Sequence, residues 1–323
     1  MQQNAASHKN YLRHMILVVE VLNSGTSHPT IHALDTSCRA LAARLSGASD
    51  AFLKDPMFEP FRKIFSARSE ARRPAVPAGQ RIYVVGDIHG RLDLFEELIG
   101  AIERDDLEAP PADTTIVLLG DLVDRGPESA GVVARAREWQ AARRVRILAG
   151  NHEEMFLESF EDTNLLRHFL KHGGRETLLS YGVTPERYND STLEELQELL
   201  HGAVPSTDRD FLRGLEECFA IGDYLFVHAG ILPEVPIEDQ ARHDMLWIRE
   251  RFLRYPDRHS HVVVHGHTIQ EDIDERDNRI GIDTGAYRTG RLTALVLEGA
   301  ARRYIQAVDG AGAITIHKRE TAS

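Results

Sequence analysis

Cysteine is scarce in this sequence, which contains only Cys38 and Cys218 among its 323 residues. Two cysteines cannot form the disulfide framework of a small secreted domain, and they cannot supply a thiolate-rich metal site. We therefore expect a reducing, cytoplasmic location. Any metal ion that the chain binds should be held by histidine, aspartate or asparagine.

Long apolar runs are missing as well. The longest one near the start, residues 15–22, includes Glu20 and is far too short to span a bilayer. Its surroundings lack the basic segment and the small-residue cleavage site of a signal peptide. We therefore predict neither a signal peptide nor a membrane partner.

Positive charge is in deficit. The chain has 38 lysines and arginines against 50 aspartates and glutamates, which gives a formal net charge of -12. A general nucleic-acid binder needs a basic face to neutralise phosphates, so we predict no nucleic-acid partner, although the composition leaves room for a local basic pocket. The 42% hydrophobic content is enough for a well-buried core.

The domain organisation follows from changes in residue pattern along the chain. Residues 1–56 show no catalytic motif, and we expect a poorly ordered extension there. Residues 57–80 combine an amphipathic stub with a basic linker rich in proline and alanine. Residues 81–308 form the expected catalytic domain, and residues 309–323 a C-terminal tail. Met57 is a candidate start of the native protein, and N-terminal peptide mapping that detects earlier residues would exclude it.

Within the catalytic domain, short apolar runs rich in β-branched residues predict buried strands, and longer periodic segments predict helices. The predicted strands are residues 82–85, 115–119, 145–149, 224–227, 261–264, 279–282, 292–297 and 303–306, and the predicted helices are residues 92–104, 129–140 and 153–160. The alternation indicates an α/β first half and a more antiparallel second half. Residues 165–219 read as a mostly helical insertion, which packs or shapes a substrate cleft.

Five of the predicted strands end in motifs that carry metal-type side chains. These motifs are GDIHG at 86–90, GDLVDRG at 120–126, GNHE at 150–153, HAG at 228–230 and HGH at 265–267. Each motif is weak by itself, because a lone histidine is usually structural and Asp-Gly pairs usually mark turns. Loops at the carboxyl ends of strands converge on one crevice, however, so five such motifs predict a shared site.

The residue types in these motifs indicate a two-metal centre. The candidate metal ligands are Asp87, His89, Asp121, Asn151, His228 and His267. A carboxylate such as Asp121 can bridge two cations through its two oxygens, and mixed nitrogen and oxygen ligands suit Mn, Fe or Zn better than Ca. Two such ions roughly 3.5–4 Å apart generate a bridging hydroxide that attacks phosphorus in line. We therefore expect hydrolysis of a phosphate ester.

Further residues fit this chemistry by their positions. His152 follows Asn151 and is the candidate general acid, and Asp124 is placed to orient it and keep it protonated. Arg125 offers a planar fork for bidentate phosphate binding. Arg249 is a second candidate phosphate clamp, for which Arg251 and Arg254 compete. A role for His265 as a supporting donor and for Tyr287 as a cap of the pocket stays open, and the other histidines, including His168 and His172, read as surface or packing residues.

The ordered motifs GD-x-HG, GD-x-VDRG, GNHE, HAG and GH resemble those of the phosphoprotein phosphatase family of calcineurin-like metallophosphoesterases, over residues 81–306. The resemblance implies an α/β (α+β) fold, a four-layer αββα sandwich of two mixed β-sheets flanked by helices. It implies two divalent metal ions, with Mn first and Fe or Zn as alternatives. Asp87, His89 and Asp121 would bind the first metal, and Asp121, Asn151, His228 and His267 the second. His152 with Asp124 would be the acid and its partner, and Arg125 and Arg249 the phosphate arginines.

Within that family, the GGRETLLSYG stretch at 173–182 and the IDTGA and LTALVLE segments resemble bacterial and phage-type serine/threonine protein phosphatases. Phosphorylated proteins or small phosphorylated molecules are the substrates that this implies. A symmetrical bis(5'-nucleosyl)-tetraphosphatase is the alternative enzyme, and an inactive scaffold is the non-enzymatic alternative, against which the intact ligands and His152 argue. The sequence leaves the substrate, the native metal and the oligomeric state open.

Overall fold

The computed structural model describes residues 73–310 and 312–320. The extension expected at residues 1–56 and most of the expected linker lie outside the described residues. Within them, helices and strands alternate up to β3 and strands dominate after residue 213, and the strands form two sheets.

The larger sheet has six strands in the order β11-β10-β9-β1-β2-β3. β1 pairs in parallel with β2, and β2 with β3, whereas β9, β10 and β11 are joined to β1 by antiparallel pairs. The strands are β1 (Gln80–Val85), β2 (Asp113–Leu118), β3 (Val145–Ile147), β9 (Arg291–Glu298), β10 (Ala301–Gly310) and β11 (Ala313–Glu320).

The smaller sheet has five strands in the order β4-β5-β6-β8-β7. Its central strands β5, β6 and β8 are parallel, and its edge strands β4 and β7 are antiparallel to their neighbours. The strands are β4 (Cys218–Ile221), β5 (Tyr224–Val227), β6 (Val262–His265), β7 (Asp274–Glu275) and β8 (Arg279–Gly281). Both sheets are therefore mixed.

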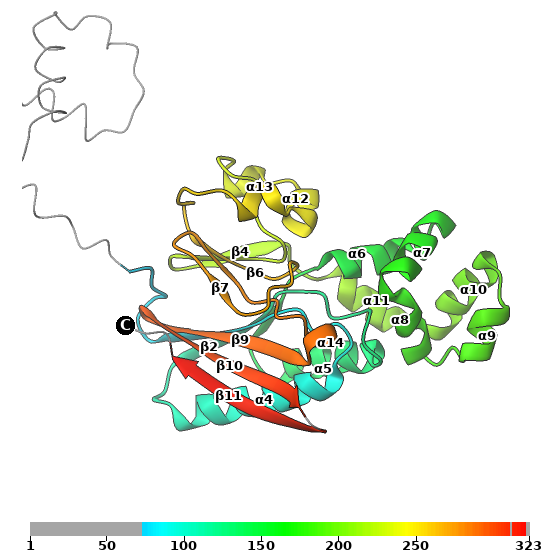
Figure 1. Ribbon diagram of the computed structural model, residues 1–323, viewed down its shortest axis with the longest axis horizontal. Helices are drawn as coiled ribbons and strands as arrows, with labels where there is room; N and C mark the ends of the chain where they lie inside the picture. Colours follow the sequence, from blue (N-terminus) through cyan, green and yellow to red (C-terminus); the bar gives the residue numbers. More distant parts are fainter. Residues whose placement is uncertain (1–72, 311, 321–323) are drawn as a thin grey trace, which may run out of the picture. The chain divides into compact units, whose positions relative to one another are not determined.

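Helices cover the outer face of each sheet. α4 (Leu92–Glu108) and α5 (Ser129–Ala142) lie against the larger sheet, whereas α12 (Arg242–Trp247) and α13 (Glu250–Leu253) lie against the smaller one (Figure 1). α4 stops where Ala109 precedes Pro110, because a residue before proline disfavours the helical conformation. Two mixed sheets with flanking helices confirm the predicted fold class.

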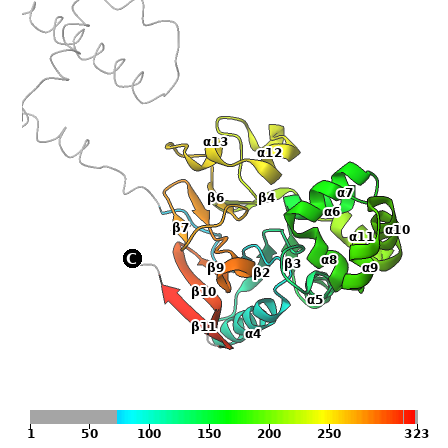
Figure 2. The same cartoon turned by 45° about the vertical axis from the view of Figure 1, so that its right-hand side comes forward.

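A third group of helices lies to one side of the two sheets (Figure 2). This group follows β3 and carries the inserted segment between the first and second halves of the fold. Its members are α6 (Asn151–Glu158), α7 (Thr163–Phe169), the π-helix η4 (Leu170–Gly174), α8 (Arg175–Ser180), α9 (Pro185–Asp190), α10 (Leu193–Ala203) and α11 (Ser206–Arg213). Two short elements elsewhere are η5 (Ile237–Asp239) and α14 (Ala286–Thr289).

Successive side chains of a strand point to opposite faces of the sheet, so the larger sheet contributes to a core on each face. In β1, Ile82 and Val84 join a core cluster that also contains Tyr224 and Phe226 of β5, so these side chains fill the space between the sheets. The intervening residue Tyr83 joins the cluster formed with the helices that cover the larger sheet. Almost every residue of β1 is buried, which is why this strand reads as a continuous apolar run.

The predicted more antiparallel second half is confirmed, because five of its strand pairs are antiparallel and two are parallel. Two details differ from the sequence-based predictions. The expected tail contains β11, in which only Ile314 and Ile316 alternate with polar residues before a polar stretch follows. The two short edge strands were not predicted, since β4 begins inside the expected helical insertion and β7 consists of Asp274 and Glu275.

Truncation of Phe226 tests the core between the sheets. Its side chain is 0% exposed, so Phe226→Ala should lower the free energy of unfolding by about 3–5 kcal/mol through lost burial and the cavity left behind. Urea unfolding followed by circular dichroism measures the change. Leu107→Ala is the control, because that side chain is 85% exposed and should change stability by less than about 0.5 kcal/mol. Equal effects of the two substitutions would contradict this account of the core.

Among the described residues, no helix combines the length and the apolar character that a membrane span requires.

Candidate metal centre

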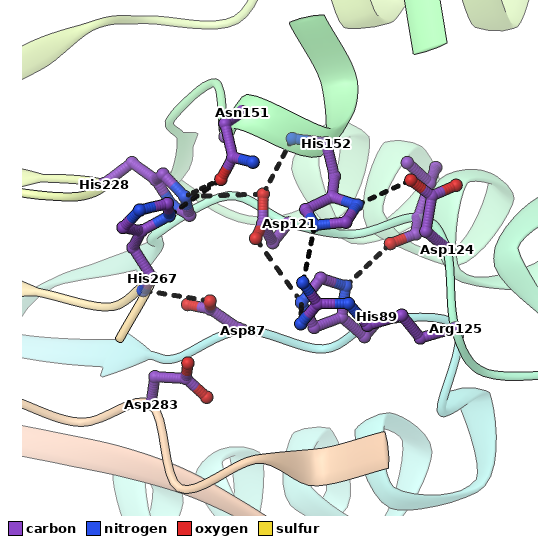
Figure 3. A network of polar contacts seen from close by, with 12 residues as sticks. Asp87, His89, Asp121, Asp124, Arg125, Asn151, His152, His228, His267 and Asp283 are labelled. Carbon is purple, nitrogen blue, oxygen red and sulfur yellow. Dashed lines mark hydrogen bonds and ion pairs between the residues drawn. The ribbon is translucent and has the colours of Figure 1, made fainter. Parts of the chain in front are cut away.

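The predicted metal ligands gather where the strands of both sheets end. Asp87 follows β1, Asp121 follows β2, and Asn151 begins the helix after β3. His228 follows β5, and His267 lies two residues beyond the end of β6. Figure 3 shows these side chains pointing toward one another from five separate loops, and each of them is buried.

Asp121 lies at the middle of the cluster and faces two sides. One carboxylate oxygen, Oδ1, is 3.4 Å from Nε2 of His228, and the other, Oδ2, is 3.4 Å from Nε2 of His89. The backbone N–H of His152 donates to the same Oδ1 at 3.1 Å, which fixes the orientation of the carboxylate. A carboxylate that presents one oxygen to each side has the geometry of a bridging ligand.

On one side of Asp121, three acceptor atoms crowd together. Asn151 Oδ1 lies 3.0 Å from Nε2 of His228 and 2.8 Å from Nδ1 of His267. His228 donates its Nδ1–H to the carbonyl oxygen of Leu119 at 2.8 Å, so its Nε2 carries a lone pair toward Asn151. An imidazole lone pair, an amide oxygen and a carboxylate oxygen facing one another are satisfied by a cation between them.

On the other side, His89 is oriented in the same way. Its Nδ1–H donates to the carbonyl oxygen of Val123 at 2.8 Å, which leaves Nε2 as the atom that faces Asp121. The ligand atoms of His89, Asp121 and His152 all lie within 4.8 Å of one another, as do those of Asp121, His228 and His267. Asp121 is therefore common to two compact groups. The first of these groups contains His152, whereas the sequence analysis expected Asp87 beside His89 and Asp121.

Asp87 lies beside these groups, next to a second buried carboxylate. Its Oδ2 accepts from the backbone N–H of His267 at 2.9 Å, whereas its Oδ1 is buried without a hydrogen-bond partner among the described residues. Oδ2 of Asp283 and Nε2 of His267 are also buried without a hydrogen-bond partner among the described residues. Burial and the charge of Asp283 raise the pKa of Asp87 well above its ordinary value. Unpaired buried carboxylates are costly, and a divalent cation would satisfy them.

This donor set therefore fits divalent metal ions. It offers oxygen atoms from aspartate and asparagine and nitrogen atoms from histidine, and in His89 and His228 a backbone carbonyl holds the opposite ring nitrogen. That pattern of supported imidazoles is usual among metal-binding histidines. No cysteine of the described part of the chain belongs to either group.

His152 and Asp124 form a buried pair next to the metal groups. Nδ1 of His152 lies 2.6 Å from Oδ2 of Asp124, and both side chains are almost completely buried. Burial alone would lower the pKa of His152, but the carboxylates of Asp121 and Asp124 outweigh it and raise that pKa above its ordinary value. The hydroxyl of Thr177 donates to Oδ1 of Asp124 at 2.6 Å, and the backbone N–H of Asp124 donates to Ser129 Oγ at 2.9 Å.

The guanidinium group of Arg125 lies against two histidines of the site. Nη1 lies 2.9 Å from Nε2 of His89, and Nη2 lies 2.9 Å from Nε2 of His152. The guanidinium carbon is 4.8 Å from the ring centroid of Tyr287, which itself packs edge-on against His89. The structure thus places Arg125 beside the predicted acid, with Tyr287 covering it.

Arg249 is exposed and lies at the N-terminal end of α13. Burial lowers the pKa values of these two histidines, and the charge of Arg249 is among the causes that lower them further. His265 points elsewhere, because its ring packs on Phe252 and its Nε2 is 3.4 Å from Arg279 Nη1. It is thus directed to the outer face of the smaller sheet.

Glu153 has a structural role that the sequence analysis missed. Its carboxylate accepts from four backbone N–H groups, those of Gly150, Asp121, Leu122 and Val123, at 2.7 to 3.2 Å. These donors belong to the loops after β2 and β3, so one buried side chain fixes both loops. Its position three residues after Gly150, at the start of a helix, is the sequence signal that could have indicated this capping role.

Asp283 and Thr177 were missed for different reasons. Asp283 follows β8 in the same way that Asp87 follows β1, so the strand-end rule that found Asp87 could also have found it. Burial raises the pKa of Asp283 to about 6, and the charge of Asp121 adds to that rise. Thr177 lies in a helical segment without any ligand motif, and no local pattern identifies it.

The backbone of the site is strained. Among the described residues, six that are not glycine have positive φ angles, and five of these belong to the site. They are His89, Asp121, Asp124, Arg125 and His267, with φ between 47° and 74°. Strain of this kind costs about 1–3 kcal/mol at each residue and concentrates where function requires it. Gly150 and Gly266 add close approaches, because a Cβ at either would overlap the carboxylate of Asp121 or Asp87.

Comparison with known proteins gives a family match and several relatives. The family model described as calcineurin-like phosphoesterase matches residues 80–288, more than half of the chain. The symmetrical bis(5'-nucleosyl)-tetraphosphatase of Acidovorax ebreus is 35% identical over 158 residues, which make up 49% of this chain and 47% of that protein. Serine/threonine-protein phosphatase 2 of Escherichia coli is 27% identical over 223 residues, 66% of this chain and 91% of that protein.

A solved structure of a cold-active protein tyrosine phosphatase matches with a TM-score of 0.46 and 19% identity, and the match covers 75% of this chain and 81% of that one. The chain spans about half the length of the tetraphosphatase relatives that it matches.

Proposed function

The chain belongs to the calcineurin-like phosphoesterase family, and we propose that it is a metal-dependent hydrolase of phosphate monoesters, most specifically a serine/threonine protein phosphatase. The observation that carries the proposal is the position of Asp121, whose two carboxylate oxygens each face a histidine on a different side. A bridging carboxylate between two groups of nitrogen and oxygen ligands is the central requirement of a two-metal phosphoesterase.

The metal ligands are assigned as follows in this proposal. Asp121 belongs to both metal sites, together with Asp87 and His89 at the first, and Asn151, His228 and His267 at the second. The divalent ions, of which Mn is our first choice with Fe or Zn as alternatives, would polarise the phosphoryl oxygens and activate the attacking water. Asp283 lies close enough to raise the pKa of Asp87, and we assign it a supporting role.

The other side chains of the site position the substrate and move a proton. Arg125 can bind two phosphoryl oxygens through its planar fork, and Arg249 would add a second positive charge. Nε2 of His152 faces Nη2 of Arg125 at 2.9 Å, and when protonated it would donate its proton to the leaving oxygen. The carboxylate of Asp124, 2.6 Å from Nδ1, holds the imidazole in the orientation that this transfer needs and favours its protonated form.

A phosphorylated serine or threonine in a protein is the substrate that we favour. The supporting observation is that the similarity to the Escherichia coli serine/threonine phosphatase extends over 91% of that protein. The half-buried guanidinium group of Arg125 also suits a terminal phosphate, which offers it two free oxygens.

A dinucleoside polyphosphate is the second candidate substrate. The similarity to the symmetrical tetraphosphatase of Acidovorax ebreus favours it, with a higher identity of 35%, although this similarity covers 47% of that protein. The two reactions can use the same metal ligands and differ in the leaving group, which is an alkoxide in one case and a nucleotide phosphate in the other.

A substrate panel tests the proposal. Purified protein with Mn, Fe or Zn should hydrolyse p-nitrophenyl phosphate and phosphoserine or phosphothreonine peptides, with released phosphate as the readout. Preferential release of ADP from diadenosine tetraphosphate would favour the second candidate instead. Metal removal with a chelator should abolish hydrolysis, and re-addition of the metal should restore it. Protein that hydrolyses neither the phosphopeptides nor p-nitrophenyl phosphate with any of the three metals would overturn the proposed function.

A further inference from the structure

We propose that four basic side chains at the junction of α7 and η4, Arg167, His168, Lys171 and His172, form a subsite that binds acidic residues next to the phosphorylated residue of a protein substrate. This proposal rests on the proposed function and specifies its substrate further. We call these four residues the basic strip.

The side chains of the strip are exposed and share one side of the helix. All four are accessible to solvent. Arg167 and Lys171 are four residues apart, as are His168 and His172, so each pair is separated by about one helical turn. The two imidazole rings lie 4.2 Å apart between their centroids. The strip is therefore a continuous surface feature, about one turn long.

The strip leads in sequence to a segment that contacts the loop of Arg125. η4 ends in a kink at Gly173, which has φ of 111°, and the carbonyl oxygen of this residue accepts from the backbone N–H of Arg125 at 3.1 Å. A Cβ on Gly173 would lie 2.7 Å from the Arg125 backbone nitrogen, so no side chain fits between the two segments. His172 is thus one residue from a direct contact with the loop that carries Arg125.

The surroundings of the strip are positive. In the described part of the chain, neither Arg167 nor Lys171 forms an ion pair, and Arg167 contacts only the amide oxygen of Asn164, at 3.3 Å. Partial burial lowers the pKa of His168, and the charges that lower it further are all positive: those of His172, Lys171 and His152.

The strip gathers positive charge on a chain with a formal net charge of -12. Basic residues in the last turn of a helix stabilise its dipole, and this offers a structural reason for Arg167 and His168 in α7 and for Lys171 and His172 in η4. The strip also continues into the segment that contacts the loop of Arg125, and there its charge complements an anionic group of the substrate.

The shape of the strip favours an acidic peptide over a polyphosphate chain. In a polyphosphate, the second phosphate is bonded through one oxygen to the first and would lie among the metal ligands and Arg125. Acidic side chains that flank a phosphoserine extend several ångströms from the phosphate along the peptide. An exposed strip that is joined through Gly173 to the Arg125 loop matches the second arrangement.

The test compares two phosphoserine peptides of equal length, one with aspartate and glutamate around the phosphoserine and the other with alanine and glutamine there. The unmodified protein should show a kcat/KM about tenfold higher for the acidic peptide, mainly through a lower KM, and the preference should decrease as salt is added. In the double variant Arg167→Ala/Lys171→Ala, the preference should fall to within about twofold. Hydrolysis of p-nitrophenyl phosphate should be unchanged.

The control is Arg144→Ala/Arg213→Ala, which removes two exposed arginines that have acidic partners elsewhere. It should keep the full preference for the acidic peptide. Thermal unfolding of both double variants separates a structural role from a binding role, because a strip that only stabilises the helix would lower the unfolding temperature and leave the preference intact.

Three outcomes would overturn the subsite: no preference in the unmodified protein, an equal loss on both peptides in the strip variant, or faster hydrolysis of diadenosine tetraphosphate with an equal dependence on the strip. Each of these leaves p-nitrophenyl phosphate hydrolysis intact. Failure of the proposed function is distinguishable, since it removes hydrolysis of every substrate.

Discussion

Asp121→Asn should lower kcat/KM for every phosphate ester by about three orders of magnitude or more. Metal ions supply several kcal/mol of charge stabilisation in such sites, and about 1.4 kcal/mol corresponds to a factor of ten in rate. Asparagine keeps the size of the side chain and one oxygen that can accept from the backbone N–H of His152. It replaces the other oxygen with an amide group that cannot bind a cation, so one of the two sides of the cluster loses its shared ligand.

Metal content and activity together measure this effect. We expect the substituted protein to bind less metal per chain after purification and dialysis, as determined by elemental analysis, and to keep its circular dichroism spectrum. Asp210→Asn provides the matched control, because Asp210 is an exposed aspartate of α11 whose side chain is 72% exposed, and its replacement should change neither quantity. Unchanged hydrolysis by Asp121→Asn would remove the two-metal mechanism altogether.

His152→Ala should lower kcat for phosphopeptides by about 10²–10⁴-fold, because the leaving alkoxide then departs without a positioned acid. The loss should be much smaller for p-nitrophenyl phosphate, since p-nitrophenolate is a weak base that leaves without protonation. KM should change little for either substrate. Steady-state kinetics with both substrates, at saturating metal, gives this comparison directly.

The contrast between the substrates distinguishes the proposed acid from a metal ligand. The ring nitrogen of His152 lies within 4.8 Å of the ligand atoms of His89 and Asp121, so a role as a metal ligand is the alternative. Loss of a ligand would reduce both activities alike and lower the metal content. His317→Ala is the control, because His317 is exposed on β11 and contacts Thr315 rather than the site. An equal loss on both substrates would exclude the role as general acid.

The buried strands and the metal-type side chains that follow them could be predicted from the sequence. Buried strands with β-branched residues stand out as apolar runs, and the side chains after them meet because parallel strands end at one edge. This rule is why the sequence alone predicts that Asp87, Asp121 and Asn151 lie near one another. β11 was missed because its alternate residues are polar and its pairing with β10 is a tertiary contact.

What could not be predicted were contacts between segments that have no shared local pattern. Thr177 donates a hydrogen bond to Asp124 from 53 residues away, and neither segment has a local sequence pattern that indicates this contact. The pairing of Arg125 with Gly173 is also nonlocal and depends on how the helical insertion packs. Arg249 was predicted only through the Trp and Arg pattern around it, and the structure shows it as an exposed residue at the N-terminal end of α13.

The positive φ angles of the site residues affect how the stability and the activity of this protein would change under selection. His89, Asp121 and His267 adopt a conformation that glycine would adopt without strain. Selection for resistance to heat alone would therefore reward glycine at positions that the chemistry needs. A variant library screened only for folding should accumulate its most stabilising changes around the metal centre and become progressively inert, and stability in this protein would then be a poor guide to fitness.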